Sequence, residues 1–340
     1  MKFGKPIQRA LQLLRHRPPS WWRVAINQAA AMARWTYVPC LPVHVTVEPT
    51  NLCDQRCPIC ETGNRTLARP RGSMKLAAYY RLVDQLSRHA HTLMFYFMGE
   101  PFLHPDAYLM IQHAKSRGMF VTACTDGNHV NGEALVRSGI DEVSWQLGGA
   151  TQSTHKMYRV GGRLDHALAN LSAAVAEKRR LGVARPQLRL GLIVMRHNEH
   201  EIEDFARLAK EVGADACDIV KPCVRNKAEA ERFMPTDPTY WQYDKGLFER
   251  TGRLRPLVDL RNSCHWIWHS TVITWDGRVL PCCRDPHGQH AMGNVFEQPL
   301  SRIWNNPAYR TYRRTILTAQ SRVDICKLCS GFGVPDKRGK

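Results

Sequence analysis

Between Val43 and residue 221, short apolar runs alternate with stretches of helical periodicity, and this alternation limits the possible folds more than any other feature. It predicts six strands, at residues 43–49, 92–98, 119–125, 141–147, 187–195 and 216–221. It also predicts five intervening helices, at about residues 75–89, 105–117, 131–138, 164–181 and 199–212. Repeated units of this kind favour an α/β fold with a parallel sheet. Six strands and five helices fit a partial (βα)6 barrel, although a flat doubly wound sheet fits the same spacing.

Three cysteines follow the first predicted strand in a C-x3-C-x2-C loop: Cys53, Cys57 and Cys60. Three thiolates this close together can hold three irons of a [4Fe–4S] cluster and leave the fourth iron open to a small chelating molecule. Zinc is the alternative, but zinc prefers four closed ligands, and no nearby histidine completes the set. The motifs farther along the chain help to decide between an iron–sulfur cluster and zinc.

The second predicted strand ends in Gly99-Glu100-Pro101, and this tripeptide after the cysteine loop resembles the radical S-adenosylmethionine (SAM) superfamily. In that family, SAM chelates the open iron, and one electron from the cluster breaks a C–S bond to give a 5′-deoxyadenosyl radical. The resemblance implies the partial barrel of this family. It also places the SAM amino group at Gly99 and Glu100, where a carboxylate can form a charge-assisted hydrogen bond. Met98 stands where the family has a further glycine.

Two more residues match positions of the SAM site in this family. Ser144, on the fourth predicted strand, matches a serine whose hydroxyl contacts SAM, and Gln146 replaces the aspartate that is usual two residues later. Arg159 matches an arginine that binds the SAM carboxylate, to which a guanidinium is a bidentate partner. A solvated surface arginine is the alternative reading of Arg159. The resemblance assigns no catalytic acid or base in this chain.

A second group of cysteines lies near the carboxyl end: Cys264, Cys282, Cys326 and Cys329. Alternating apolar residues on both sides of Asp276-Gly277 predict a hairpin that brings the first two together. A helical pattern over residues 300–317 can return the last two. The spacing resembles the SPASM/twitch extensions of radical SAM enzymes and implies a second, auxiliary [4Fe–4S] cluster. Cys283 is an alternative to Cys282 as ligand, and a zinc ribbon is the alternative to the cluster.

These patterns divide the chain into a basic leader at 1–42, a barrel at 43–223, a linker at 224–262, an auxiliary cluster domain at 263–330 and a tail at 331–340. The leader combines helical spacing with arginine and tryptophan, which suits a helix on a membrane surface. Capping one end of the barrel is the commoner role of such a segment. We therefore expect the leader to close the barrel, with peripheral membrane contact as the alternative.

The 340 residues carry a formal net charge of +18, which favours acidic partners such as nucleic acid, anionic lipid or a phosphorylated substrate. A merely basic surface explains the charge equally well. Lysine and arginine interrupt every apolar run of the leader, so no signal peptide is predicted, and no stretch reaches the ~20 apolar residues that span a bilayer. We expect a cytoplasmic protein, because a reducing compartment suits twelve cysteines and an oxygen-sensitive cluster.

An auxiliary cluster with four protein thiolates has no iron free for substrate, so its physical use is to relay an electron. We therefore expect an oxidoreductase that abstracts a substrate hydrogen and oxidises the substrate radical through this cluster. A flavodoxin or ferredoxin would supply the reducing electron. A small polar substrate such as a sugar, cyclitol or phosphate ester suits the charge. The alternatives are a peptide-modifying maturase and a metal-stabilised nucleic-acid-binding protein, but the latter leaves the cysteine loop unexplained.

Overall fold

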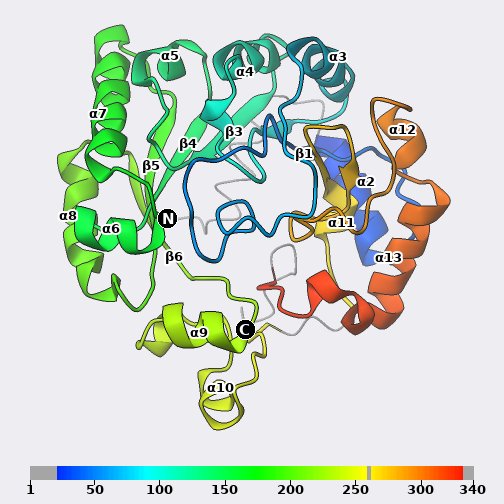
Figure 1. Cartoon of the computed structure of the whole chain (residues 1–340). Helices are drawn as coiled ribbons and strands as arrows, with labels where there is room; N and C mark the ends of the chain where they lie inside the picture. Colours follow the sequence, from blue (N-terminus) through cyan, green and yellow to red (C-terminus); the bar gives the residue numbers. More distant parts are fainter. Residues whose placement is uncertain (1–20, 259–261, 332–340) are drawn as a thin grey trace, which may run out of the picture.

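The computed structural model describes residues 21–258 and 262–331, and its centre is one curved sheet with helices along its outer side (Figure 1). The strands are β1 (His44–Val47), β2 (Thr92–Met94), β3 (Phe120–Thr125), β4 (Glu142–Leu147), β5 (Gln187–Ile193), β6 (Ala216–Val220), β7 (Ser270–Ile273) and β8 (Val279–Leu280). The order across the sheet is β6-β5-β4-β3-β2-β1-β7-β8, and every neighbouring pair except β7–β8 is parallel. All six strands predicted for the barrel are confirmed.

The five predicted barrel helices are also present: α3 (Leu76–Leu86), α4 (Ala107–Ser116), α5 (Gly132–Arg137), α7 (Leu164–Leu181) and α8 (Ile202–Glu211). A further helix, α6 (Gln152–Tyr158), was not predicted. It begins with a capping box in which the Thr151 hydroxyl accepts from the Thr154 backbone N–H. Side chains that alternate along each strand separate the two faces of the sheet. Trp145 and its like-facing neighbours are fully buried beneath the helices, whereas the residues between them face the concave side.

The predicted hairpin is confirmed, and it extends the barrel sheet. β7 pairs in parallel with β1 from His44 opposite Ser270 to Val47 opposite Ile273, and β8 returns antiparallel to β7. Gly277 makes the turn with φ of +86°, a conformation that suits glycine. The expected boundary at residue 263 is therefore crossed by a continuous sheet, and one apolar core contains side chains from both sides of it.

The single helix predicted for residues 300–317 is wrong, because the structure divides it into α12 (Leu300–Ile303) and α13 (Pro307–Ala319). The amide oxygen of Asn306 accepts a hydrogen bond from the Tyr309 backbone N–H at 2.9 Å, so Asn306 starts a new helix. Proline follows at the first helical position, where its missing N–H costs no hydrogen bond. A short 3-10 turn, Asp324–Cys326, then leads into the last cysteine pair.

The segment predicted as a linker, residues 224–262, contains two α-helices, α9 (Lys227–Phe233) and α10 (Lys245–Thr251). Its apolar side chains form a second buried cluster that includes Cys57 and Ile59 of the cysteine loop. Trp241 is held there by a hydrogen bond from its indole N–H to the Pro235 carbonyl at 2.8 Å. The segment thus packs directly against the cysteine loop.

Helix α2 (Trp21–Met32) is the described part of the predicted leader; residues 1–20 lie outside the described residues. It packs against α11 (Trp266–His269), which leads into β7, and the Gln28 side chain contacts the ring nitrogens of His265 and His269 at 3.2 and 3.1 Å. Its buried residues are Asn27, Ala30 and Ala31. Across the described ranges, no helix combines the length and apolar character that a membrane span requires.

Candidate functional site

The cysteine loop leaves the carboxyl end of β1, where the loops of a parallel barrel gather. Cys57 is buried, and Cys53 and Cys60 are partly buried. Gly63 allows the loop to fold tightly, because a Cβ at this position would lie 2.5 Å from the Cys57 backbone nitrogen. Burial raises the pKa of the Cys53 and Cys57 thiols, and the neighbouring cysteine raises each of them further. A positive centre is therefore needed to keep these thiols ionised.

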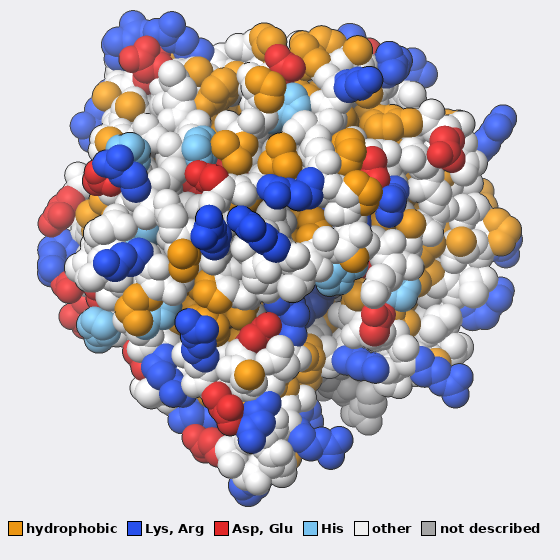
Figure 2. Space-filling view, viewed as in Figure 1, with side chains coloured by type: hydrophobic (Ala, Val, Ile, Leu, Met, Phe, Trp, Pro, Cys, Tyr) orange, Lys and Arg blue, Asp and Glu red, His pale blue; other side chains and the backbone are white. Residues whose placement is uncertain are grey.

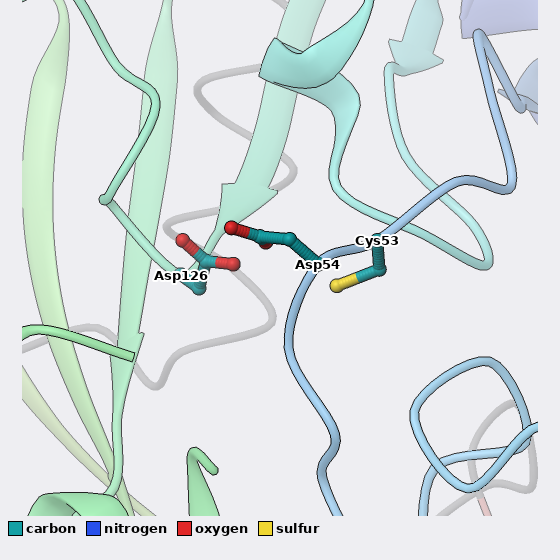
Figure 3. Close-up of side chains that lie close together, drawn as sticks. All are labelled: Cys53, Asp54 and Asp126. Atoms are coloured by element: carbon teal, nitrogen blue, oxygen red, sulfur yellow. The ribbon is translucent and has the colours of Figure 1, made fainter. Parts of the chain in front are cut away.

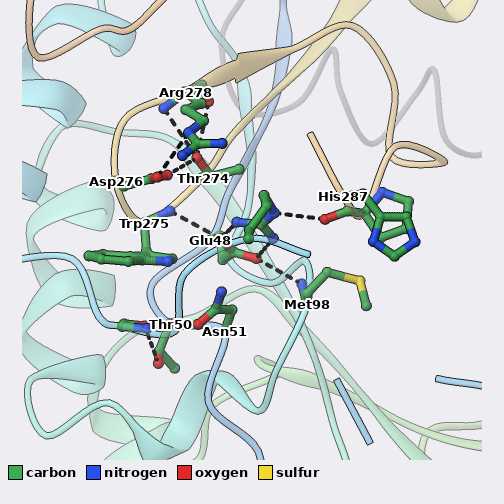
Figure 4. Close-up of polar contacts among 12 residues, drawn as sticks. Glu48, Thr50, Asn51, Met98, Thr274, Trp275, Asp276, Arg278 and His287 are labelled. Carbon is green, nitrogen blue, oxygen red and sulfur yellow. Dashed lines mark hydrogen bonds and ion pairs between the residues drawn. The ribbon is translucent and has the colours of Figure 1, made fainter. Parts of the chain in front are cut away.

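A buried ion pair fixes the start of this loop (Figure 4). The Glu48 carboxylate accepts two hydrogen bonds from the Arg69 guanidinium, at 2.7 and 2.8 Å, and both side chains are fully buried. It also accepts from the backbone N–H groups of Met98, at 3.3 Å, and Trp275, at 3.1 Å. One carboxylate thus connects the ends of β1 and β2 with the β7–β8 hairpin.

Gly99 and Glu100 lie directly against the cysteine loop. Gly99 has a φ of +93°, and a Cβ on it would lie 2.6 Å from the Asn51 carbonyl carbon. The Glu100 backbone N–H donates to the Leu52 carbonyl at 2.8 Å. The Glu100 carboxylate accepts from the Thr125 hydroxyl and from two backbone N–H groups. Burial, together with a nearby carboxylate, raises its pKa. The side chain therefore already holds the end of β3, and its contact with SAM stays a prediction.

Asp126 joins the site although it was not among the predicted site residues. Its carboxylate lies with the Cys53 thiol and the Asp54 carboxylate in a group whose ligand atoms are all within 4.8 Å of one another (Figure 3). Asp54 also pairs with the ring of His129 at 2.7 Å. The signal that could have found Asp126 is its position directly after β3, at the same sheet edge as the cysteine loop.

Arg159 points at the cysteine loop. Its Nη1 donates to the Cys57 sulfur at 3.6 Å, and its guanidinium carbon lies 5.4 Å from the centre of the Tyr158 ring. The side chain is partly buried. These contacts remove the alternative of a solvated surface arginine, and they place a permanent positive charge beside the cluster cysteines.

Ser144 lies on the concave face of β4, opposite Cys124 on β3. Its hydroxyl accepts a hydrogen bond from the Gln146 side-chain amide at 2.6 Å. Gln146 in turn lies opposite Gly191, where a Cβ would approach the Gln146 amide nitrogen to 2.3 Å. Gly191 therefore makes room for a polar side chain on the inner face of the barrel. The departure from the family's aspartate leaves Gln146 engaged with Ser144.

Buried polar atoms around the loop show whether these residues fit a cluster with a polar ligand. Four such atoms have no hydrogen-bond partner among the described residues: Gln55 Nε2, Thr62 Oγ1, His155 Nε2 and Arg159 Nε. Burial lowers the pKa of His155 to about 4, so its ring is neutral at pH 7. Polar atoms without partners are costly in a protein interior unless a ligand or water satisfies them. Three thiols beside them fit a [4Fe–4S] cluster that carries a polar ligand.

The structure also brings the second group of cysteines together. Cys264, Cys282 and Cys326 are partly buried, and the charges of neighbouring cysteines, Cys329 among them, raise the pKa of their thiols in addition to burial. The Arg284 backbone N–H donates to the Cys282 sulfur at 3.5 Å, the kind of contact that tunes iron–sulfur clusters. Cys283 is next to Cys282 in the chain, and the charge of Cys329 also acts on its thiol. Both Cys282 and Cys283 therefore lie near the other cysteines, and neither is favoured as the ligand.

Two protein-family models match the chain over the same regions. The model described as the radical SAM superfamily matches residues 47–209, and the model described as the SPASM iron–sulfur cluster-binding domain matches residues 264–330. The first match begins at the end of β1 and includes the cysteine loop. The second begins at the first auxiliary cysteine and ends one residue after the last.

Curated relatives match most of the chain at low identity. A tungsten-containing aldehyde ferredoxin oxidoreductase cofactor-modifying protein of Pyrococcus furiosus is 22% identical, over 84% of this chain and 87% of its own length. A PqqA peptide cyclase of Gluconobacter oxydans is 24% identical, over 82% of this chain and 81% of its own length. The similarity thus extends beyond the cysteine motifs to more than four fifths of the chain.

Solved structures share the fold. The chain called BtrN, in complex with AdoMet and 2-DOIA, superimposes with a TM-score of 0.52 at 19% identity, covering 85% of this chain and 93% of that one. Streptococcus suis SuiB, bound to the precursor peptide SuiA, gives a TM-score of 0.61 at 14% identity, covering 90% of this chain and 74% of that one. At these identities the likeness supports the fold.

Proposed function

Because the chain belongs to the radical SAM superfamily and carries a C-terminal SPASM-type domain, we propose that it abstracts a hydrogen atom from a small acidic substrate and oxidises the resulting radical through its auxiliary cysteine site. When bound, the first cluster and SAM supply the 5′-deoxyadenosyl radical that makes this chemistry possible. The observation that carries the proposal is that the chain holds two separate sets of cysteines, one of three and one of four. Both sets are attached to one continuous sheet.

The chain's own residues hold and orient the two reactants at the first site. Cys53, Cys57 and Cys60 would bind three irons and leave one for SAM. The guanidinium of Arg159 would then bind the SAM carboxylate, because it already points at Cys57 and its Nε has no partner among the described residues. Gly99 would admit the SAM amino group at the end of β2, and Ser144 would offer its hydroxyl from the concave face.

The auxiliary site would act as an electron relay. We assign its four thiols to Cys264, Cys282, Cys326 and Cys329, with Cys283 as the alternative to Cys282. Four thiolates fill every protein-facing position of a [4Fe–4S] cluster, so no iron is left to bind substrate. Because the Arg284 N–H points at the Cys282 sulfur, the protein stabilises negative charge on this cluster and so raises its affinity for an electron. A flavodoxin or ferredoxin would complete the circuit as the external donor.

A cavity of about 650 Å³ between the cysteine loop and the auxiliary domain supports an acidic substrate. Glu61, the residue after Cys60, lines one side, and Lys327, between the last two cysteines, lines another. The charged side chains around it are the cationic Arg225, Lys227, Arg253, Arg284 and Lys327 and the anionic Glu61, Asp285 and Asp324, which leaves an excess of two positive charges. Lys and Arg side chains are spread over the same face of the molecule (Figure 2). Such a cavity favours a carboxylate- or phosphate-bearing molecule.

Anaerobic reconstitution tests the proposal first. We expect about eight irons per chain, the content of two four-iron clusters. Addition of dithionite and SAM should release 5′-deoxyadenosine. A candidate sugar, cyclitol or phosphate ester deuterated at the reacting carbon should pass its deuterium into that product. A well-reconstituted sample that releases none contradicts the enzyme assignment, and an iron content near half the expected value removes the auxiliary cluster from the mechanism.

Peptide modification is the second candidate, because the relatives named above include a peptide cyclase and a structure that holds a precursor peptide. The same deuterium experiment separates the two candidates. Transfer from a labelled peptide, and from none of the small acidic molecules, would favour the maturase and would contradict our choice of substrate class. It would leave the roles of the two cysteine sites unchanged.

A further inference from the structure

The outward face of α2 is apolar, which reverses the usual arrangement of a surface helix. Its solvent-exposed residues are Trp21, Trp22, Ala25, Ile26, Ala29 and Met32, and Ala33 follows directly. Trp21 is 60% exposed and Met32 is 71% exposed. The polar Asn27, by contrast, is fully buried against the protein. A helix of a globular protein normally turns its apolar stripe toward the core. We call these outward residues the α2 face.

Two more exposed aromatic side chains follow the helix in the sequence, Trp35 at 53% and Tyr37 at 52% exposed. Of the fifteen large hydrophobic side chains that are exposed in the described part of the chain, six fall within residues 21–37. These six include every exposed tryptophan among the described residues. A patch of this kind marks a surface that is covered by something in the working protein.

The two stretches of sequence that contain and adjoin the α2 face carry basic residues and no acidic ones. The first 47 residues contain no aspartate or glutamate, and they carry Lys2, Lys5, Arg9, Arg15, Arg17, Arg23 and Arg34. The guanidinium carbon of Arg23 lies 4.5 Å from the centre of the Trp22 ring. Helix α13 adjoins this region, since Arg313 donates to the Thr36 carbonyl. Residues 298–323, which contain α13, also lack acidic side chains.

We propose that the α2 face lies in the headgroup region of an anionic phospholipid bilayer. Tryptophan and tyrosine favour the membrane–water interface, because a large apolar ring and a polar N–H or O–H can each find a suitable environment there. Lysine and arginine beside them are attracted to anionic headgroups. The helix has 12 residues and is about 18 Å long, so it lies on a membrane and does not cross its ~30 Å core.

The charge also argues against the other occupants of this face. A second copy of the chain would bring two cationic surfaces together, and like charges across an interface are unfavourable. Residues 1–20 carry five lysine or arginine residues and no acid, so covering the α2 face with them would place cations beside Arg23. An anionic bilayer is the partner that complements both the apolar side chains and the charge. The inference does not depend on the proposed radical chemistry.

Vesicle flotation of the full-length, reconstituted protein tests the inference. We expect binding to equimolar phosphatidylglycerol–phosphatidylcholine vesicles, weakening as salt is raised, and little binding to pure phosphatidylcholine. The variant with Ile26→Glu and Met32→Glu should bind about tenfold or more weakly, because two charges are forced against the headgroups. Leu109→Glu is the matched control: Leu109 is 47% exposed on helix α4, and its substitution should leave binding unchanged.

Several outcomes would overturn the inference. Equal binding to charged and uncharged vesicles, or no binding by the wild type, would remove the anionic bilayer as partner. Sedimentation of a dimer that Ile26→Glu dissociates would assign the α2 face to a second copy. Tighter vesicle binding after deletion of residues 1–20 would show that the leader covers the face in the full chain. Circular dichroism and release of 5′-deoxyadenosine by each variant establish that it is folded.

Discussion

The two cysteine sites are built in opposite ways. At the first, Cys53 to Cys60 lie on one loop that leaves a single strand, and neighbouring strand ends only support them. At the second, Cys264 lies two residues before α11 and Cys282 lies two residues after β8. Cys326 ends the 3-10 turn Asp324–Cys326, and Cys329 follows it. A short loop can arrange its own ligands, whereas the second arrangement exists only after the hairpin and α13 have folded against the barrel. The first site should therefore tolerate global destabilisation better than the second.

The two sites are nevertheless joined by specific contacts. Glu48 binds both Arg69 and the Trp275 backbone, and the Arg69 side chain also donates to the Pro286 carbonyl at 2.7 Å. The Ala68 backbone N–H donates to the ring of His287 at 3.2 Å. The segment at Ala68 and Arg69, which follows the cysteine loop, is thus held against the segment at Pro286 and His287 of the auxiliary domain. Substitutions at and between the two sites separate what each contributes.

Loss of one ligand at each site should have the largest effects, and different ones. Cys57→Ala should abolish SAM cleavage, because the cluster loses one of its three protein ligands. Cys326→Ala should leave SAM cleavage intact and block substrate turnover. The measurement is release of 5′-deoxyadenosine beside product formation, with iron content determined for each variant. Normal turnover by the Cys326 variant would contradict the relay.

Loss of the Glu48–Arg69 ion pair, which links the two cysteine sites, should have the next largest effect. Glu48→Gln removes a buried charge from beside Arg69 and should reduce the free energy of unfolding by about 3–5 kcal/mol. Chemical denaturation under anaerobic conditions measures the change. Glu177→Gln, which removes a carboxylate paired with Arg137 and Arg180 on the outer helices, should cost less and should not reduce the iron content of either site. An equal loss in both variants would contradict a linking role for Glu48.

Acidification should reduce the free energy of unfolding through His269, the last residue of α11. Burial lowers the pKa of His269 to about 4, so its ring is neutral in the folded chain and gains a proton on unfolding below its ordinary pKa near 6.5. The stability it contributes is present above about pH 6.5 and is lost as the pH falls toward 4, by at most about 3 kcal/mol. Urea midpoints across this range should fall less steeply for His269→Gln. Exposed His166, changed in the same way, should leave the slope as it is in the wild type.

Two helix caps give the smallest and most selective comparison, although the Asn306 amide also donates to the Met292 carbonyl at 2.7 Å. Asn306 caps α13 on the auxiliary side and Asn131 caps α5 on the barrel, each by accepting a backbone N–H at 2.9 Å. Substitution of either by alanine should cost about 1 kcal/mol in unfolding free energy. Only Asn306→Ala should also lower the iron content of the auxiliary site, because α13 leads to Cys326 and Cys329. Equal iron loss in both variants would show that the two sites fold as one.

The sequence was sufficient for features whose causes are local. Apolar runs, turns and closely spaced cysteines predicted the six barrel strands and the thiol group of the first loop, whereas the auxiliary cysteines were assigned through their resemblance to SPASM/twitch extensions. It failed where distant segments decide: the pairing of β7 with β1 and the place of Asp126 beside Cys53 depend on tertiary packing. The break in the last helix was a different kind of miss. Asn306-Pro307 is a recognisable helix start, but the helical periodicity continues across it and favours one uninterrupted helix.

The parallel ladder between β1 and β7 has a consequence for how this protein can be divided. A fragment ending at residue 263 would lack β7, and the backbone of β1 would then become the open margin of the sheet. An uncovered apolar strand of that kind recruits other chains, so the excised barrel should precipitate or associate. The segment after residue 263 therefore covers the exposed edge of β1 and also carries the auxiliary cysteines, so removing it removes both.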